Sequence, residues 1–127
     1  MTGKQLFEIS LDLLGLKNEN GDIPSDTDDL GSRALALINI LLAENSILDS
    51  RIKRQEHTVR TLVSLDTELG VSDIVASTVL PYGLAALLML GEDDGLADSM
   101  QRLYNEARIN ALKFGKAKAE PITEVYR

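Results

Sequence analysis

The longest apolar stretch of this 127-residue chain runs from Val79 to Leu90 and is interrupted by Pro81 and Gly83. A helix that crosses a bilayer needs about twenty apolar residues, so this stretch is too short to span one. It therefore predicts a helix buried in a protein core and no association with a membrane. Pro81 lies inside that helix and removes one backbone hydrogen bond, so we expect a kink there.

The composition favours helices over sheets, because 22 Leu and 11 Ala outnumber 6 Val and 9 Ile and aromatic residues make up only 4%. A chain of this length is expected to form one helical domain over residues 1–127 with a sufficient core. The absence of Cys excludes disulfides, thiolate metal sites and cysteine nucleophiles. The single His leaves one candidate for imidazole catalysis.

The spacing of apolar residues predicts four helices. The first runs from Thr2 to Leu14, with Thr2 and Gln5 as a capping box and Gly15 in the left-handed position after the helix. Its expected apolar face comprises Leu6, Ile9 and Leu13, with Phe7 and Leu14 beside it.

The other helices follow a polar loop at residues 16–26. The second is expected over 27–53, capped by Ser25 or Thr27, with a possible break near Asn45–Ser46. The third runs from the cap Ser72 to Gly91, and the fourth from Glu92 until Pro121 stops it. The apolar stripe expected in the fourth helix is Leu96, Met100, Leu103, Ala107, Ala111 and Phe114. Asn39 lies in an apolar part of the second helix, so we expect its amide to be hydrogen-bonded in the core.

Two segments lack helical periodicity. Residues 59–65 alternate apolar and polar side chains, which indicates a short strand between the second and third helices. Residues 119–127 are expected to form an extended tail. The predicted fold class is therefore all-α, a four-helix bundle-like domain with a short β segment and an extended C-terminal tail.

Several polar clusters contain residue types that can bind metals or act in catalysis. Asp26 and Asp28 fit the first positions of a calcium loop, but Leu30 and Leu37 occupy positions that require ligands. The acidic run Glu92–Asp94 is typical of a helix start. The sequence contains no GxSxG, GxxxxGK or GxGxxG motif, so no catalytic motif accompanies the single histidine, His57. We therefore expect no enzymatic activity, no cofactor and no metal site.

Two segments are candidate docking surfaces. Arg51, Lys53, Arg54 and Arg60, with His57 between them, form a basic cluster that either is solvated, contacts an acidic partner or contacts phosphates. The tail carries Pro121, Ile122, Val125 and Tyr126, which have too little company to form a core of their own. An extended apolar segment can add to a sheet edge, either within the subunit or on a neighbour.

The second half resembles a known family. The run Val79–Leu88 (VLPYGLAALL), the turn Gly91–Asp94 (GEDD) and the run Leu103–Ala107 (LYNEA) look like segments of the head–tail connector (adaptor) proteins of tailed bacteriophages and prophages. The first helix ending in Leu13–Gly15, the polar loop, the long Leu/Ala/Asn helix and a tail ending near Glu124–Tyr126 also match. The resemblance covers about residues 3–126, although its motifs are short.

The resemblance implies a structural role in the virion, and in the host bacterial cytoplasm before assembly. Such subunits form a homo-oligomeric ring below the portal protein that extends the DNA channel without sequence-specific binding and docks tail-completion or tail proteins. The net charge of −7 suits such a channel, because an acidic surface does not hold phosphates. The acidic residues 1–50 and the basic residues 101–127 suit contacts between copies. The alternative is a bacterial helical module, a regulator or antitoxin-like protein, that binds protein or nucleic acid through the basic cluster.

Overall fold

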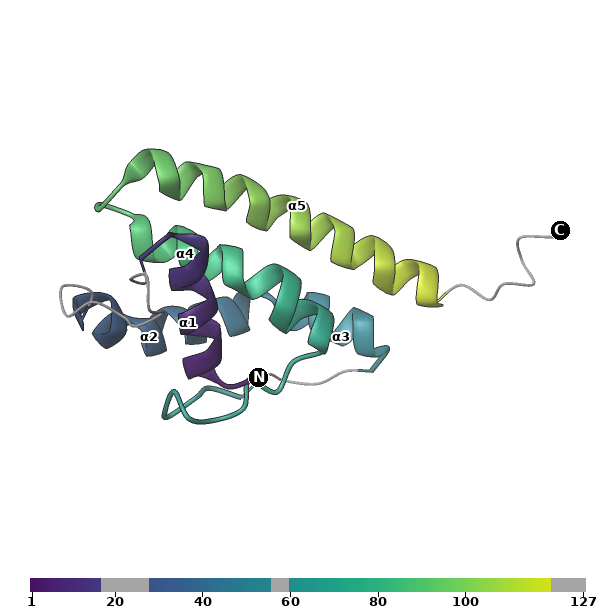
Figure 1. Ribbon diagram of the computed structural model, residues 1–127. Helices are drawn as coiled ribbons and strands as arrows, with labels where there is room; N and C mark the ends of the chain where they lie inside the picture. The colour runs from purple at the N-terminus through teal and green to yellow at the C-terminus, as the bar shows by residue number, and fades with distance from the viewer. Residues whose placement is uncertain (17–27, 56–59, 120–127) are drawn as a thin grey trace, which may run out of the picture.

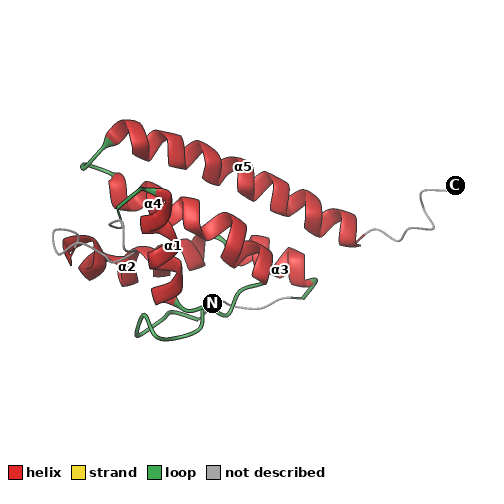
Figure 2. Ribbon diagram, viewed as in Figure 1, coloured by secondary structure: helices red, strands yellow, loops and turns green. Residues whose placement is uncertain are grey.

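The helices of the protein surround one apolar helix at the centre (Figure 1). The computed structural model describes residues 1–16, 28–55 and 60–119. Its elements, in chain order, are α1 (Gly3–Leu13), α2 (Asp28–Glu44), α3 (Ser46–Lys53), the π-helical turn η2 (Val75–Val79), α4 (Leu80–Met89) and α5 (Asp94–Ala119). Within these described ranges the fold is all-α and contains no strand (Figure 2).

The central helix is α4, which forms most of the apolar stretch from Val79 to Leu90. It contacts α1, α2 and α5, and nearly all of its side chains are buried. The long helix α5 runs antiparallel to α4 and continues over α3 (Figure 1). Gly83 allows this close approach, because a Cβ atom there would lie 2.8 Å from both Leu41 Cδ2 and Tyr104 Cε1.

The expected kink at Pro81 takes the form of a π-helical turn. Residues 75–79 widen by one residue, and the amide of Leu80 donates to the carbonyl of Val75. Pro81 has no amide hydrogen and would crowd the carbonyl of Ser77 in a regular helix, so the wider turn relieves both problems. Helical backbone begins at Asp73, directly after Ser72 as predicted, and the Ala76 amide donates to the Ser72 carbonyl over 3.0 Å. The Ser72 side chain does not cap the helix, because its hydroxyl has no hydrogen-bond partner, while the Ser72 amide donates to buried Asp49 over 2.8 Å.

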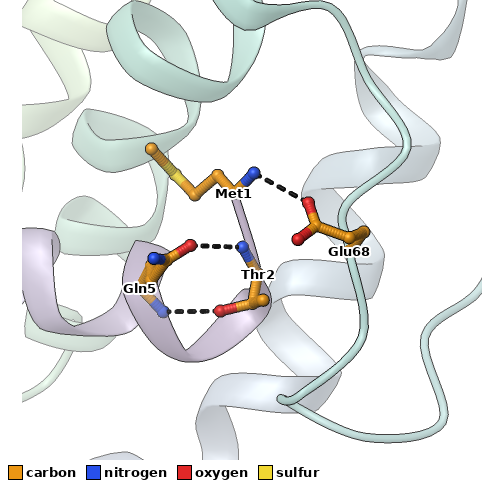
Figure 3. Close-up of polar contacts among 4 residues, drawn as sticks. All are labelled: Met1, Thr2, Gln5 and Glu68. Atoms are coloured by element: carbon orange, nitrogen blue, oxygen red, sulfur yellow. Dashed lines mark hydrogen bonds and ion pairs between the residues drawn. The ribbon is translucent and has the colours of Figure 1, made fainter.

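Helix α1 begins and ends as the sequence predicts. The Gln5 amide donates to the Thr2 hydroxyl over 3.2 Å, and the Thr2 amide donates to the Gln5 side chain over 2.9 Å (Figure 3). Gly15 adopts a φ of 69°, and the Leu16 amide bonds back to the carbonyl of Leu11.

The buried face of α1 differs from the predicted one. It comprises Leu6, Phe7, Ser10 and Leu11, whereas Leu13 is exposed and Ile9 is half-buried. The Ser10 hydroxyl donates to the carbonyls of Leu6 and Pro81, so a polar residue occupies the interface with α4.

The expected second helix is two helices joined by Asn45 alone. The expected break near Asn45–Ser46 is confirmed, and the 3-4 spacing of Leu30, Ala34 and Leu41 places these three residues in the core. Asn39 is half-buried, and its amide bonds both the N–H and the C=O of Leu62, at 2.7 and 3.0 Å. Its predicted hydrogen bonding is confirmed.

The strand predicted over 59–65 is not confirmed. Residue 59 lies outside the described residues, and residues 60–65 contain turns and irregular backbone. Asn39 occupies the Leu62 backbone groups that a strand partner would bond, and Val63 is 88% exposed. Nearby, an isolated β-bridge joins Thr2 to Glu68, and the Met1 amino group lies 2.8 Å from the Glu68 carboxylate (Figure 3).

The predicted stripe of α5 is correct in part. Met100 and Ala111 are buried and Leu96 and Ala107 are half-buried against the core, whereas Leu103 is 39% exposed and Phe114 is 49% exposed. Ala97 and Tyr104, which were not predicted, are buried in their place. The caps expected at Ser25 and Thr27, most of the 16–26 loop and the 120–127 part of the tail lie outside the described residues.

Candidate functional site

A solvent-open groove separates α3 from the C-terminal half of α5. Its volume is about 490 Å³, and its walls are mostly apolar. The lining residues are Glu44, Ile47, Leu48, Arg51, Asn105, Arg108, Ile109 and Leu112. Ile47 is 69% exposed and Ile109 is 55% exposed, so large apolar side chains meet water in this one depression. We call it the α3–α5 groove.

The groove forms because α3 and α5 pack against each other through their buried faces and leave the adjoining outer faces uncovered. Asn45 ends α2 and starts the eight-residue α3, which packs on α5 through buried Leu48 and Ile52. On α5, Ile109 and Leu112 lie beside the buried stripe that ends in Ala111. No other described element covers these two side chains.

A polar network forms the inner wall of the groove. The fully buried Asn45 side chain donates to the Leu41 carbonyl and to the Tyr104 hydroxyl, both over 2.8 Å. Arg108 Nε donates to Asn45 Oδ1 over 3.0 Å, and its guanidinium lies 5.6 Å from the centre of the Tyr104 ring. The Tyr104 hydroxyl in turn donates to Glu44.

This network favours the neutral form of Tyr104. Burial of the phenol raises its pKa, and the hydrogen bond to the Glu44 carboxylate raises it further. The buried phenol therefore stays protonated and ties α5 to the end of α2, which gives the groove a rigid base.

Charged residues line both sides of the apolar floor. Arg51 comes from α3, Arg108 from α5 and Glu44 from the end of α2. Two guanidinium groups and one carboxylate leave a net positive rim. A ligand that combines apolar side chains with carboxylates fits this surface best.

The predicted basic cluster does not form one face. Arg51 lines the groove, but Lys53 Nζ lies 3.4 Å from the buried carboxylate of Asp49 and donates to the Gly70 carbonyl over 3.1 Å. Arg54 is exposed and follows α3 with a φ of 61°. The three cations therefore lie in different environments, Arg51 in the groove, Lys53 beside Asp49 and Arg54 exposed to solvent.

The other predicted site residues, Pro121, Ile122, Val125 and Tyr126, lie outside the described residues, as do His57 and Asp26. Asp93 and Asp94 act at the start of α5, where their carboxylates accept from the amides of Leu96 and Gly91. In the described part of the chain no three His, Cys, Asp or Glu residues lie close enough to hold a metal ion.

Sequence reasoning missed most of the groove. Ile47, Ile109 and Leu112 are apolar residues that fall outside the predicted stripes, and this was the one available signal. Nothing in the local sequence joins the groove residues of α3 to those of α5, which lie more than fifty residues apart in the chain.

No helix in the described segments is long and apolar enough to cross a membrane. Comparisons of the chain with protein-family models, with curated proteins and with solved structures found no match.

Proposed function

We propose that this chain is a structural subunit that works by binding other proteins, and that it forms a ring of the kind the resembled head–tail connectors form. In this proposal the ring lies below a portal protein, extends the DNA channel and docks tail-completion or tail proteins. The chain belongs to the virion, and to the host bacterial cytoplasm before assembly. It has no enzymatic reaction, no cofactor and no membrane partner.

The observation that supports a binding role is the α3–α5 groove. Contiguous exposed apolar surface with a polar rim is typical of protein interaction sites. Ile47, Ile109 and Leu112 supply such a surface on a base held by the buried Asn45 network. A rigid base lowers the entropy cost of binding, because few groups must become ordered on association.

The segments that carry the resemblance belong to the scaffold. Val79–Leu88 forms the end of η2 and most of α4, and Leu103–Ala107 packs in the middle of α5. Gly91–Asp94 connects the two, with Gly91 at a φ of 82°. These three motifs of the resemblance therefore lie in the α4–α5 hairpin, while the groove offers the contact surface. The bundle-like arrangement of the helices and an extended docking tail at 119–127 belong to the same proposal.

The alternative of a nucleic-acid-binding module is less well supported. Phosphate binding requires several cations on one surface. Lys53 is engaged by Asp49 and the Gly70 carbonyl, whereas Arg51 lines the apolar groove. A protein-binding regulator remains the competing candidate, since it would use the same groove.

The gene neighbourhood provides the first test. Portal, terminase and capsid genes upstream with tail genes downstream are expected for a connector, whereas a regulatory operon would contradict the proposal. The decisive experiment inactivates the gene in the phage that encodes it. Electron microscopy of the lysate should then find DNA-filled heads and separate tails. Intact tailed particles would overturn the proposal.

A further inference from the structure

The α3–α5 groove has a chemistry that selects a particular kind of occupant. Its floor is apolar, its volume is about 490 Å³, and Arg51 and Arg108 stand on its two walls. Volumes of this size hold a few apolar side chains of a short segment. A short peptide with apolar side chains and acidic residues between them would fill the floor and pair with both cations.

The chain itself contains a segment of this description. Residues 120–127 read EPITEVYR and carry Ile122, Val125 and Tyr126 together with Glu120 and Glu124. The three apolar side chains match the apolar floor, and the two carboxylates match the two arginines. Charge complementarity and apolar content therefore single out this segment as the occupant.

The position of the segment in the chain favours the groove of a second copy. Leu112 is the last groove residue on α5, and the helix continues for seven residues, about 10 Å, to Ala119. Pro121 disfavours the helical conformation at Glu120 and favours an extended one. Residues after Ala119 would have to turn back along α5 to reach the groove that their own helix lines, whereas the groove of a neighbouring copy requires no such reversal.

A contact between a segment of one copy and a groove of the next is heterologous, and heterologous contacts generate rings when the rotation closes. We propose that residues 121–126 of one copy bind the α3–α5 groove of a neighbouring copy, with Ile122 and Val125 on Ile47, Ile109 and Leu112 and with Glu124 at the arginines. The ring that results rests on the proposed function, whereas the pairwise contact does not.

Peptide binding tests the contact itself. The receptor is the full-length chain with Ile122→Glu and Val125→Glu, which cannot supply its own segment. The probe is a fluorescent peptide of residues 119–127, followed by anisotropy at about 50 mM salt. We expect saturable binding that Ile109→Glu in the receptor weakens at least tenfold and that higher salt also weakens.

Matched controls make this result specific. Ile40→Glu is the control for Ile109→Glu, because both side chains are 55% exposed on helices but Ile40 lies outside the groove. Ile40→Glu should leave peptide binding unchanged. Every variant should keep the circular dichroism spectrum of the native chain. A peptide with Ile122→Glu and Val125→Glu should not bind. Absence of binding at about 1 mM probe, or equal loss with Ile40→Glu and Ile109→Glu, would overturn the proposal.

A mixing experiment identifies the copy that supplies the segment. The Ile109→Glu chain keeps an intact segment, and the Ile122→Glu, Val125→Glu chain keeps an intact groove. Sedimentation velocity of the mixture should give a one-to-one complex that grows no further, while each variant alone stays monomeric. If the mixture also stays monomeric although the peptide binds, the segment occupies its own groove and the contact between copies is wrong.

Failure of this inference differs from failure of the proposed function. Chains with Ile109→Glu that still enter virions would contradict the groove contact and leave the connector role standing. Peptide binding by a chain that never enters virions would contradict the connector role and leave the groove contact standing.

Discussion

Asn45 Nδ2 lies 2.8 Å from the phenolic oxygen of Tyr104 and donates a hydrogen bond to it, which joins the α2–α3 junction to the middle of α5. Arg108 completes the link by donating to the other end of the Asn45 amide. The same residues that break the long helix predicted from the sequence thus form the base of the groove. Breaking one helix and orienting two others are consequences of a single buried amide.

Asn45→Ala should lower the free energy of unfolding by about 1–3 kcal/mol, because it removes the hydrogen bonds that the fully buried Asn45 amide makes with Tyr104 and Arg108. Urea denaturation followed by circular dichroism measures the change. Asn105→Ala is the matched control, since Asn105 is exposed and its side chain accepts a hydrogen bond from Gln101 on the surface of the same helix. Equal effects of the two substitutions would show that the Asn45 network contributes nothing.

Gly83→Ala should destabilise the fold by about 1–3 kcal/mol, because the added methyl would lie 2.8 Å from Leu41 and Tyr104 and force α4 away from its neighbours. Gly31→Ala is the control. Its methyl would meet Phe7 at 3.6 Å, an ordinary contact, and alanine favours the helix by about 0.4–1 kcal/mol. Thermal melting should therefore move in opposite directions for the two variants, and a shared direction would contradict the close packing at Gly83.

Leu41→Ala should cost about 2–5 kcal/mol, as expected for a leucine that is 2% exposed in a packed core. Its neighbour Ile40 is 55% exposed, so Ile40→Ala should change the stability by less than about 0.5 kcal/mol. Chemical denaturation of both variants checks the orientation of α2. A larger loss for Ile40→Ala would mean that the helix faces the other way.

Stability should fall at alkaline pH because of Tyr104. Burial and the bond to Glu44 raise the phenol pKa in the folded state above its unfolded value, so folding favours the protonated form. The stability from this group is complete below pH about 10 and decreases by up to about 1.4 kcal/mol per pH unit above it. Denaturation at pH 9 and pH 11 should reveal a steeper loss for the native chain than for Tyr104→Phe. Identical slopes would contradict the raised pKa.

Deletion of residues 120–127 should leave the unfolding free energy of the helices within about 0.5 kcal/mol, because the buried residues of the described core end at Ala111. The same deletion should weaken ring formation or docking to a portal or tail partner. Thermal unfolding of the isolated chain and incorporation into virions are the two measurements. Outright unfolding would place the segment in the core, and normal incorporation would make it dispensable.

The sequence alone determined the features that depend on local interactions. The capping box of Thr2 and Gln5, the left-handed Gly15 and the buried apolar stretch from Val79 to Met89 each follow from a few neighbouring residues. The helical character of the chain follows from its Leu and Ala content for the same reason. Local preferences add up along a helix without reference to the rest of the molecule.

Tertiary structure decided which faces are buried and where surfaces meet. On α1 and α5 several rotations bury similar numbers of apolar residues, and contacts with α4 select Leu11 over Leu13 and Tyr104 over Leu103. The break near Asn45 was expected from the sequence, but its partners Tyr104 and Arg108, about sixty residues away in the chain, were not. The groove exists only after α3 and α5 have been brought together, so no local pattern contains it. A side chain is buried when two surfaces pack against each other, and only the tertiary structure determines which surfaces do so.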